Sequence, residues 1–111
     1  MNLVILSGNV GTDPFFKTIK EGGKMAMFKL VTDTHVGEKV HNEWHELVCW
    51  NDLADAVEKI LKKGDMIELQ GFLKTRSVDD PQGGKRFYTE IHVRKFTKIK
   101  THVQKPVTAA T

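Results

Sequence analysis

The sequence lacks most of the features on which secreted, membrane and metal-dependent proteins rely. Its 111 residues include one cysteine, Cys49, so no internal disulfide can form and a reducing compartment is expected. The five histidines are scattered and give no zinc-ligand spacing with that thiol, so we expect neither a metal nor another cofactor. No apolar run approaches the ~20 residues that span a bilayer, and the N-terminus has no signal-peptide pattern. The sequence therefore predicts a soluble, cytoplasmic protein without a membrane partner.

A strong charge of one sign is also missing. The chain has 17 Lys+Arg against 14 Asp+Glu, a formal net charge of +3. From Arg94 onward there are five basic residues and no acidic one, which leaves −2 for residues 1–93. A polyanionic partner must then be bound by lysines and arginines placed on one face, because the whole domain provides no strong field. The length and the 40% hydrophobic content are those of one globular domain and exclude a large multidomain enzyme.

Five segments have the composition or the alternation typical of β-strands. They cover residues 3–10, 24–34, 43–50, 65–76 and 85–96. The polar stretch 35–42 predicts a loop between the second and third strands. After the third strand, Leu53, Val57 and Leu61 recur at helical spacing, and Asn51 before them offers a capping side chain. The sequence thus predicts three strands, one helix and two further strands.

This order is that of the OB-fold, an all-β, five-stranded Greek-key barrel with one helix. Gly8 and Gly71 fall inside strands, where the close approach of two backbones in a small barrel excludes a Cβ atom. We expect the domain to cover residues 1–100. Residues 101–111 have little to bury and are expected to form a flexible tail. Because OB-folds bind single strands, oligosaccharides and proteins alike, function has to be argued from surface residues.

The third strand places two tryptophans on one face. A two-residue period puts Trp44 and Trp50 with the charged Glu46, and leaves His45 and Cys49 on the opposite face. The charge of Glu46 marks the tryptophan face as the wetter one. One interpretation is a stacking platform, since an exposed indole can stack on a base of any identity. The other is that a loop or a second subunit covers each indole. The pattern alone leaves both open.

Basic residues lie on the polar faces of the neighbouring strands. Lys29, Lys74 and Arg76 could contact phosphates beside such a platform, although a solvated strand face explains any single lysine equally well. A catalytic site is not expected. Cys49 and His45 are the nearest nucleophile and base, but on a strand they lie roughly 13 Å apart, which excludes a dyad.

Five stretches together resemble, in order and spacing, the bacterial single-stranded DNA-binding protein family. They are LVILSGNVGTDP, FKLVTD, EWHELVCWNDLADAVEKILKKGD, IELQGFLKTRS and GGKRFYTEIHV, and they run from about residue 3 to residue 93. The resemblance implies an OB-fold homotetramer that wraps single-stranded DNA without sequence preference. It also implies a nucleoid-associated role in replication, recombination and repair, without catalytic activity. The alternative is a protein-interaction module similar to the primosomal OB-fold relatives of this family.

The resemblance also implies roles for individual positions. Trp44 and Trp50 fall where the family stacks bases, and basic positions of the family border its phosphate path. The candidates for DNA binding are Trp44, Trp50, Lys17, Lys29, Lys63, Lys74, Arg76, Phe72 and Arg86. The first strand is apolar on both faces, which a solitary barrel would leave partly exposed. The candidates for a subunit contact are Leu3, Val4, Ile5, Leu6 and His45, the last of which could equally be a hydrogen-bonded core histidine.

Two aromatic positions of the family carry aliphatic residues in this chain. Well-studied members have further tryptophans near Val36 and at Val78, so two stacking partners are missing. Phe72, Phe87 or Tyr88 could replace them. Phe87 and Tyr88 are adjacent on a strand and cannot both face the DNA, and the sequence does not decide between them.

Charge departs from the family pattern as well. Glu46 and Asp52 stand where well-studied members have basic residues. We therefore expect weaker or more salt-sensitive binding than is usual for the family. Members that serve the replisome also carry an acidic C-terminal tip that recruits partner proteins. This sequence has no acidic residue after Glu90, so that tail is absent from it.

Overall fold

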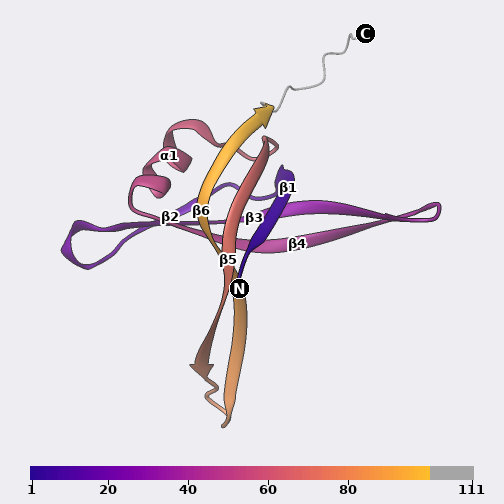
Figure 1. The fold of residues 1–111 in the computed structure, drawn as a ribbon. Coiled ribbons are helices and arrows are strands. Elements are labelled where there is room, and N and C mark those ends of the chain that lie inside the picture. Colours follow the sequence, from indigo (N-terminus) through magenta and orange to yellow (C-terminus); the bar gives the residue numbers. More distant parts are fainter. Residues whose placement is uncertain (101–111) are drawn as a thin grey trace.

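The computed structural model describes residues 1–100, so the expected tail at 101–111 lies outside the described residues. This part of the chain forms six strands, one α-helix and one 3-10 turn (Figure 1). The elements are β1 (Val4–Val10), β2 (Phe15–Thr18), η1 (Lys20–Gly22), β3 (Lys24–Val36), β4 (Lys39–Trp50), α1 (Asp52–Ile60), β5 (Met66–Asp79) and β6 (Lys85–Lys100). Within residues 1–100, no helix is long and apolar enough to cross a membrane.

Five of the strands close into a barrel. The sheet order is β1-β5-β6-β4-β3, and a pairing of β1 with β3 at Asn9↔Val31 completes the ring. All these pairings are antiparallel except β4 with β6, which run parallel at Leu47↔Ile91 and Val48↔His92. The helix α1 connects β4 to β5 and packs against β3, β4 and β6. The predicted strand and helix order is confirmed by this arrangement.

The core consists of the inward-facing apolar side chains of all five barrel strands and of the helix. Its largest fully buried members are Leu30, Leu47, Ile67, Leu69, Val10, Val57 and Cys49. Burial raises the pKa of the Cys49 thiol to about 12, so the thiol stays protonated and unreactive at neutral pH. The face of the third predicted strand that carries Leu47 and Cys49 is therefore the core face, as its pattern indicated.

Two strand glycines lie where backbones approach each other closely. A Cβ atom on Gly8 would lie 2.2 Å from the carbonyl oxygen of Val31, and one on Gly71 would lie 2.3 Å from that of His92. No side chain fits at such distances, so the predicted reason for both glycines is confirmed.

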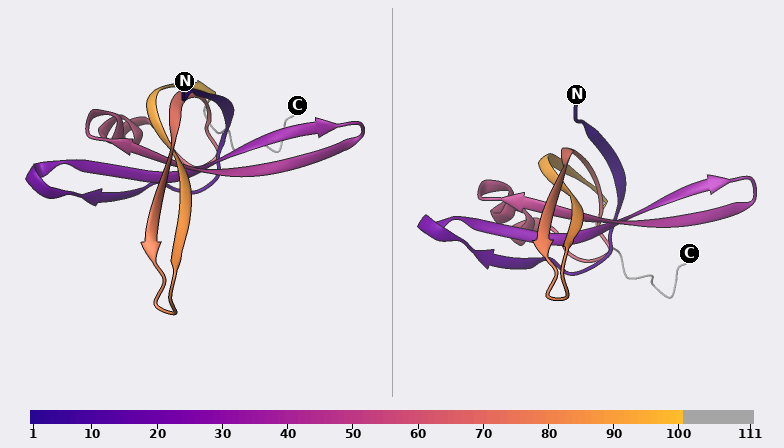
Figure 2. Two further views of the ribbon diagram at one scale, coloured as in Figure 1. Left: turned by 60° about the horizontal axis from the view of Figure 1, so that its bottom comes forward. Right: turned by 90° about the horizontal axis from the view of Figure 1, so that it is seen from below.

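The expectation of a loop at 35–42 was wrong. β3 and β4 remain paired out to Val36↔Lys39, and Gly37 turns the chain with φ +63. The ribbon extends away from the barrel, as does the β5–β6 hairpin (Figure 2). A two-stranded ribbon exposed on both faces has no apolar alternation, because only main-chain hydrogen bonds hold it together. Hydrophobic periodicity therefore gave no signal there.

Two local features were also missed. The short strand β2 follows the Asp13-Pro14 break and pairs with β3 from Phe15↔Met27 to Thr18↔Lys24. Asn51 precedes α1, but its side chain makes no capping hydrogen bond to the helix. Its Oδ1 instead accepts from the backbone N–H of Lys24, 3.2 Å away, and its backbone has φ +52. Asn51 thus joins the end of β4 to the start of β3.

Candidate nucleic-acid interface

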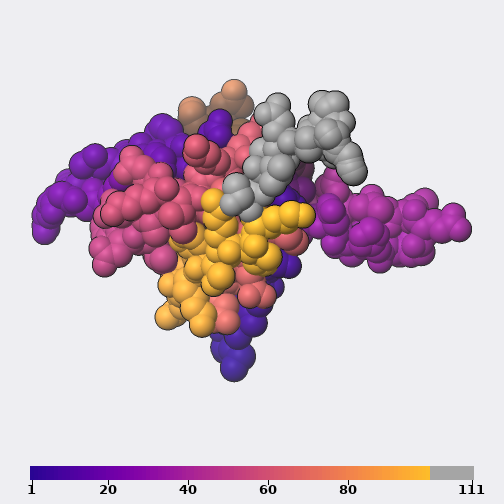
Figure 3. Space-filling view, turned by 90° about the horizontal axis from the view of Figure 1, so that it is seen from above, coloured from indigo at the N-terminus to yellow at the C-terminus, as the bar shows by residue number. Residues whose placement is uncertain are grey.

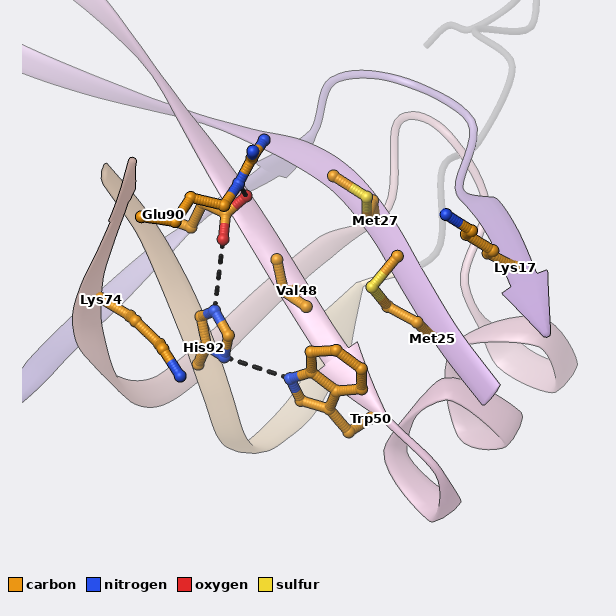
Figure 4. Close-up of a pocket in the computed structure, with 9 residues that line it drawn as sticks. Lys17, Met25, Met27, Val48, Trp50, Lys74, Glu90 and His92 are labelled. Atoms are coloured by element: carbon orange, nitrogen blue, oxygen red, sulfur yellow. Dashed lines mark hydrogen bonds and ion pairs between the residues drawn. The ribbon is translucent and has the colours of Figure 1, made fainter. Parts of the chain in front are cut away.

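A groove of about 410 Å³ opens on the outer face of the barrel. Inward-facing Ala26 and Phe28 leave the alternate side chains of β3 on this outer face, and Leu47 and Cys49 do the same for β4. Five strands contribute to the lining (Figure 4). The lining residues are Lys17, Met25, Met27, Val48, Trp50, Lys74, Arg76, Glu90 and His92.

Trp50 is the aromatic side chain of this groove. Its relative exposure is 37%, so the indole is accessible from solvent. The indole Nε1–H donates to Nδ1 of His92 at 3.1 Å, and the two ring centroids lie 5.9 Å apart (Figure 4). The hydrogen bond holds the indole by its edge, which defines the orientation of the ring in the groove.

An acidic side chain lies inside the groove, but its charge is compensated. Glu90 is buried, and its Oε2 accepts from Nε of Arg76 at 2.9 Å, while its Oε1 lies 3.3 Å from Nε2 of His92. The hydrogen bond between Arg76 and Glu90 raises the pKa of the Arg76 guanidinium above its ordinary value. A polyanion approaching the groove therefore meets a paired carboxylate, and Lys74 and Lys17 add positive charge elsewhere in the lining.

Two lysines complete the rim of the groove. Lys17 is on β2, Lys74 is on β5, and both side chains are exposed. Among residues 1–100, neither of them is in an ion pair. Exposed ammonium groups without a carboxylate partner are available to bind phosphate oxygens.

Trp44 lies on the same face of β4 but outside the groove. It is 57% exposed and six residues before Trp50, which is roughly 20 Å along a strand. Its ring packs over Gly11, where an added Cβ would lie 2.6 Å from the indole Cζ3. Gly11 therefore leaves room for the ring, which keeps an exposed surface.

The surface between the two tryptophans carries Lys29. Lys29 pairs in register with Glu46, so the acidic residue that departs from the family pattern lies beside a lysine. Both line a smaller hollow of about 150 Å³ with Phe15 and Met27. Because Met27 also lines the groove, the two depressions are neighbours along β3. Trp44, Lys29 and Trp50 thus follow one continuous outer face.

Besides Trp44 and Lys29, three further predicted DNA-binding residues are not among those that line the groove. Lys63 is exposed in the connection after α1. Arg86 is in an ion pair with Asp80 at 3.0 Å within the β5–β6 hairpin. Phe72 is half-buried between the His92 ring, with centroids 5.5 Å apart, and the Arg94 guanidinium, 4.9 Å from its centroid. Phe72 therefore supports the His92 ring.

The register of β5 and β6 separates Phe87 from Tyr88. Arg76 pairs with Tyr88, and the Arg76 guanidinium lies over the Tyr88 ring at 4.8 Å from its centroid. Phe87 pairs with Ser77 on the opposite face of the hairpin. Tyr88 is thus the residue on the groove side. Val78 and Val36, at the positions where the family has further tryptophans, are both exposed on the two hairpins.

The predicted subunit residues fall into two groups. Leu3 and Ile5 are more than half exposed, and the N-terminal segment protrudes from the body of the molecule (Figure 3). Val4 and Leu6 are partly buried and pack against the core of the barrel. His45 is half-buried, and its Nε2 lies 2.9 Å from Oγ1 of Thr32.

Sequence reasoning missed five lining residues, Met25, Met27, Val48, Glu90 and His92. The alternation in TEIHV did indicate that Glu90 and His92 share a face. It could not show that this face meets Trp50, because the contact joins residues 42 positions apart through a parallel pairing of β4 and β6.

Comparisons with known proteins agree with this architecture. Residues 1–99 match the model of the single-strand binding protein family. The chain is 41% identical over 102 residues to a single-stranded DNA-binding protein of Bacteroides thetaiotaomicron, and the match covers 84% of this chain and 62% of that protein. A solved structure described as Plasmodium falciparum SSB complex with ssDNA superposes with a TM-score of 0.80 at 30% identity. That match covers 91% of this chain and 95% of the other, which confirms the predicted OB-fold.

Proposed function

The chain belongs to the single-strand binding protein family, and we propose that it binds single-stranded DNA without sequence preference on the outer face from Trp50 to Trp44. The observation that carries this proposal is a groove with an apolar floor, an accessible indole and a basic rim. Such a site suits a base stacked on an aromatic ring with its phosphates outside. The solved relative whose title names a complex with single-stranded DNA supports the same ligand.

The positions of the lining residues suggest a separate role for each in DNA binding. Trp50 offers a ring to a base above the floor formed by Met25, Met27 and Val48. Lys17 and Lys74 bind the phosphates that flank this base. Arg76 pairs with Glu90 and so removes the repulsion that a free carboxylate would exert on DNA.

Trp44 provides a second stacking point. The strand continues past Lys29, which binds a phosphate beside Glu46. The separation of roughly 20 Å between the tryptophans fits within a site of about 4–16 nucleotides for one OB-fold. Val36 and Val78 offer no ring on the two hairpins, so affinity depends more on these two indoles than it does in members with four aromatic positions.

We further propose that the protein is a homotetramer that acts in DNA replication, recombination and repair at the nucleoid, and that it has no catalytic activity. Membership of the family supports this role. The exposed side chains of Leu3 and Ile5 support a contact between copies, because solvent-exposed apolar residues on a strand favour burial against a partner. The Bacteroides relative is longer than the chain described here, which spans less than two thirds of it.

A fluorescence titration with poly(dT) tests the proposal. The chain has two tryptophans, so both reporters lie on the proposed path. We expect quenching that saturates at a fixed ratio of nucleotides to protein and that a duplex of equal length does not produce. Unchanged emission would contradict the proposal and favour the alternative, a protein-interaction module that buries the tryptophan face against a protein.

A further inference from the structure

A chain of hydrogen bonds crosses the groove from Arg76 to Glu90, His92 and Trp50. We propose that His92 is a positioning residue that orients the Trp50 indole for stacking, by accepting its N–H with a neutral imidazole. This inference rests on the proposed function of Trp50. It adds a residue that does not itself stack on a base or bind phosphate.

The protonation state of His92 follows from its partners. An indole Nε1–H is a donor only, so Nδ1 of His92 has to be the unprotonated nitrogen. The proton of the neutral ring is then on Nε2, which faces Oε1 of Glu90 at 3.3 Å. The second oxygen of Glu90 accepts from Arg76. Glu90 thus selects the one tautomer of His92 that can hold Trp50.

His92 is fixed on both sides. Its side chain is buried, and its ring lies between those of Trp50 and Phe72, with centroid distances of 5.9 and 5.5 Å. Its backbone pairs with Val48 on β4 and with Phe72 on β5, so it is part of the barrel wall. An acceptor held this rigidly restricts the indole before DNA arrives. The cost of immobilising the Trp50 side chain on binding is thereby reduced.

Protonation of His92 removes the acceptor. The charged groups on its side of the groove are Glu90 from β6 and Lys74 and Arg76 from β5, while Arg94 lies beyond the Phe72 ring. Once Nδ1 carries a proton, it can no longer accept from Trp50. The contact with Trp50 therefore requires the neutral ring.

The first experiment measures Trp50 in the free protein. In a Trp44→Phe background Trp50 is the sole tryptophan, so its emission anisotropy and acrylamide quenching report on its mobility. His92→Phe keeps the ring volume but removes the acceptor, and His92→Asn keeps an acceptor near the Nδ1 position. We expect faster quenching and lower anisotropy with His92→Phe, and values close to the parent with His92→Asn.

The second experiment measures affinity for a labelled oligo(dT) with the tryptophans otherwise intact. His92→Phe should weaken binding about two- to tenfold, the range set by immobilising one side chain. His92→Asn should restore most of the loss. In a Trp50→Phe background, position 50 has no N–H to donate to His92, so His92→Phe should not weaken binding further. This background is the matched control.

The inference is overturned if His92→Phe leaves Trp50 as immobile as in the parent, or if its effect on affinity is the same in the Trp50→Phe background. Failure of the parent protein to bind oligo(dT) would overturn the proposed function instead. The quenching and anisotropy of Trp50 in the free protein decide the positioning role in either case, because they require no DNA.

Discussion

Lys98 on β6 reaches the buried carboxylate of Asp65, with Nζ 3.3 Å from Oδ2. The same ammonium group donates to the carbonyl oxygen of Ile60 at 2.8 Å, where α1 ends. The backbone N–H of Lys62 also donates to Oδ2, at 2.8 Å. Asp65 and Lys98 therefore attach the end of the helix and the connection after it to the last strand of the barrel.

Replacing Lys98 by Met should destabilise the protein by about 1–3 kcal/mol, because a buried carboxylate loses its cation and a helix carbonyl loses its donor. Urea unfolding followed by circular dichroism measures this change. Lys100→Met, two residues further along β6, is the control and should change the free energy of unfolding by less than about 0.5 kcal/mol. Equal effects of the two variants would contradict the role given to Lys98.

Replacing Trp44 or Trp50 by Ala should weaken binding to oligo(dT) by about 1–3 kcal/mol for each lost stack. Both side chains are exposed, so the free energy of unfolding should fall by much less than the 3–5 kcal/mol that is typical when a core aromatic is replaced by Ala. Fluorescence anisotropy of a labelled oligonucleotide and thermal melts separate the two quantities. A large loss of stability with unchanged affinity would show that the indoles are structural.

The basic rim should determine the salt dependence. Each phosphate contact to single-stranded DNA contributes about 0.7 to the slope of log K against log salt concentration. Lys74→Ala and Lys17→Ala should each reduce the magnitude of the slope by about that amount. Arg86→Ala is the control, since Asp80 already pairs with that guanidinium. A slope that changes with Arg86→Ala and not with Lys74→Ala would place the phosphate path on the hairpin instead.

The exposed apolar residues of β1 should determine the oligomeric state. A glutamate in place of Ile5 would bury a charge in the proposed contact and should lower the mass measured by light scattering at micromolar concentration. Val40→Glu places the same charge on a similarly exposed valine of the β3–β4 ribbon and should leave the mass unchanged. A monomeric mass for the unmodified protein would reject the homotetramer.

The Cys49 thiol should react only after unfolding. Its pKa is raised from 9.0 to about 12 by burial. Below pH 9 the thiol is protonated in both states and this group contributes no pH dependence. Between pH 9 and about 12 the unfolded thiol ionises and the folded one does not, so stability falls as pH rises. Iodoacetamide labelling should follow global unfolding, and Cys49→Ala should flatten the decrease in stability between pH 9 and 11. Rapid labelling of the native protein would show that Cys49 is accessible.

The barrel could be predicted from the sequence because most of its strands alternate between apolar and polar side chains, and the alternation shows which face is buried. Phe28 and Leu30 on β3, and Leu47 and Cys49 on β4, are examples. The ribbon beyond residue 35 was missed because a strand pair exposed on both faces has no such alternation. β2 was missed because it is only four residues long and pairs with a single neighbour.

The site was predictable in its exposed parts only. Trp44, Trp50 and Lys74 could be placed from the period of one strand and a motif. The contact of Trp50 with His92 depends on the parallel pairing of two distant strands, and neither strand by itself contains that information. The ion pair that occupies Arg86 depends likewise on the turn geometry of Asp80 within its hairpin.

The lining of the groove comes from five strands that extend from Lys17 to His92, so no contiguous fragment of the chain contains it. A DNA segment bound there would contact several strands that are distant in sequence and so connect them. Any binding restricted to the folded barrel adds to its stability in proportion to the logarithm of ligand concentration over Kd. The barrel would thus be most resistant to unfolding while it is bound to DNA.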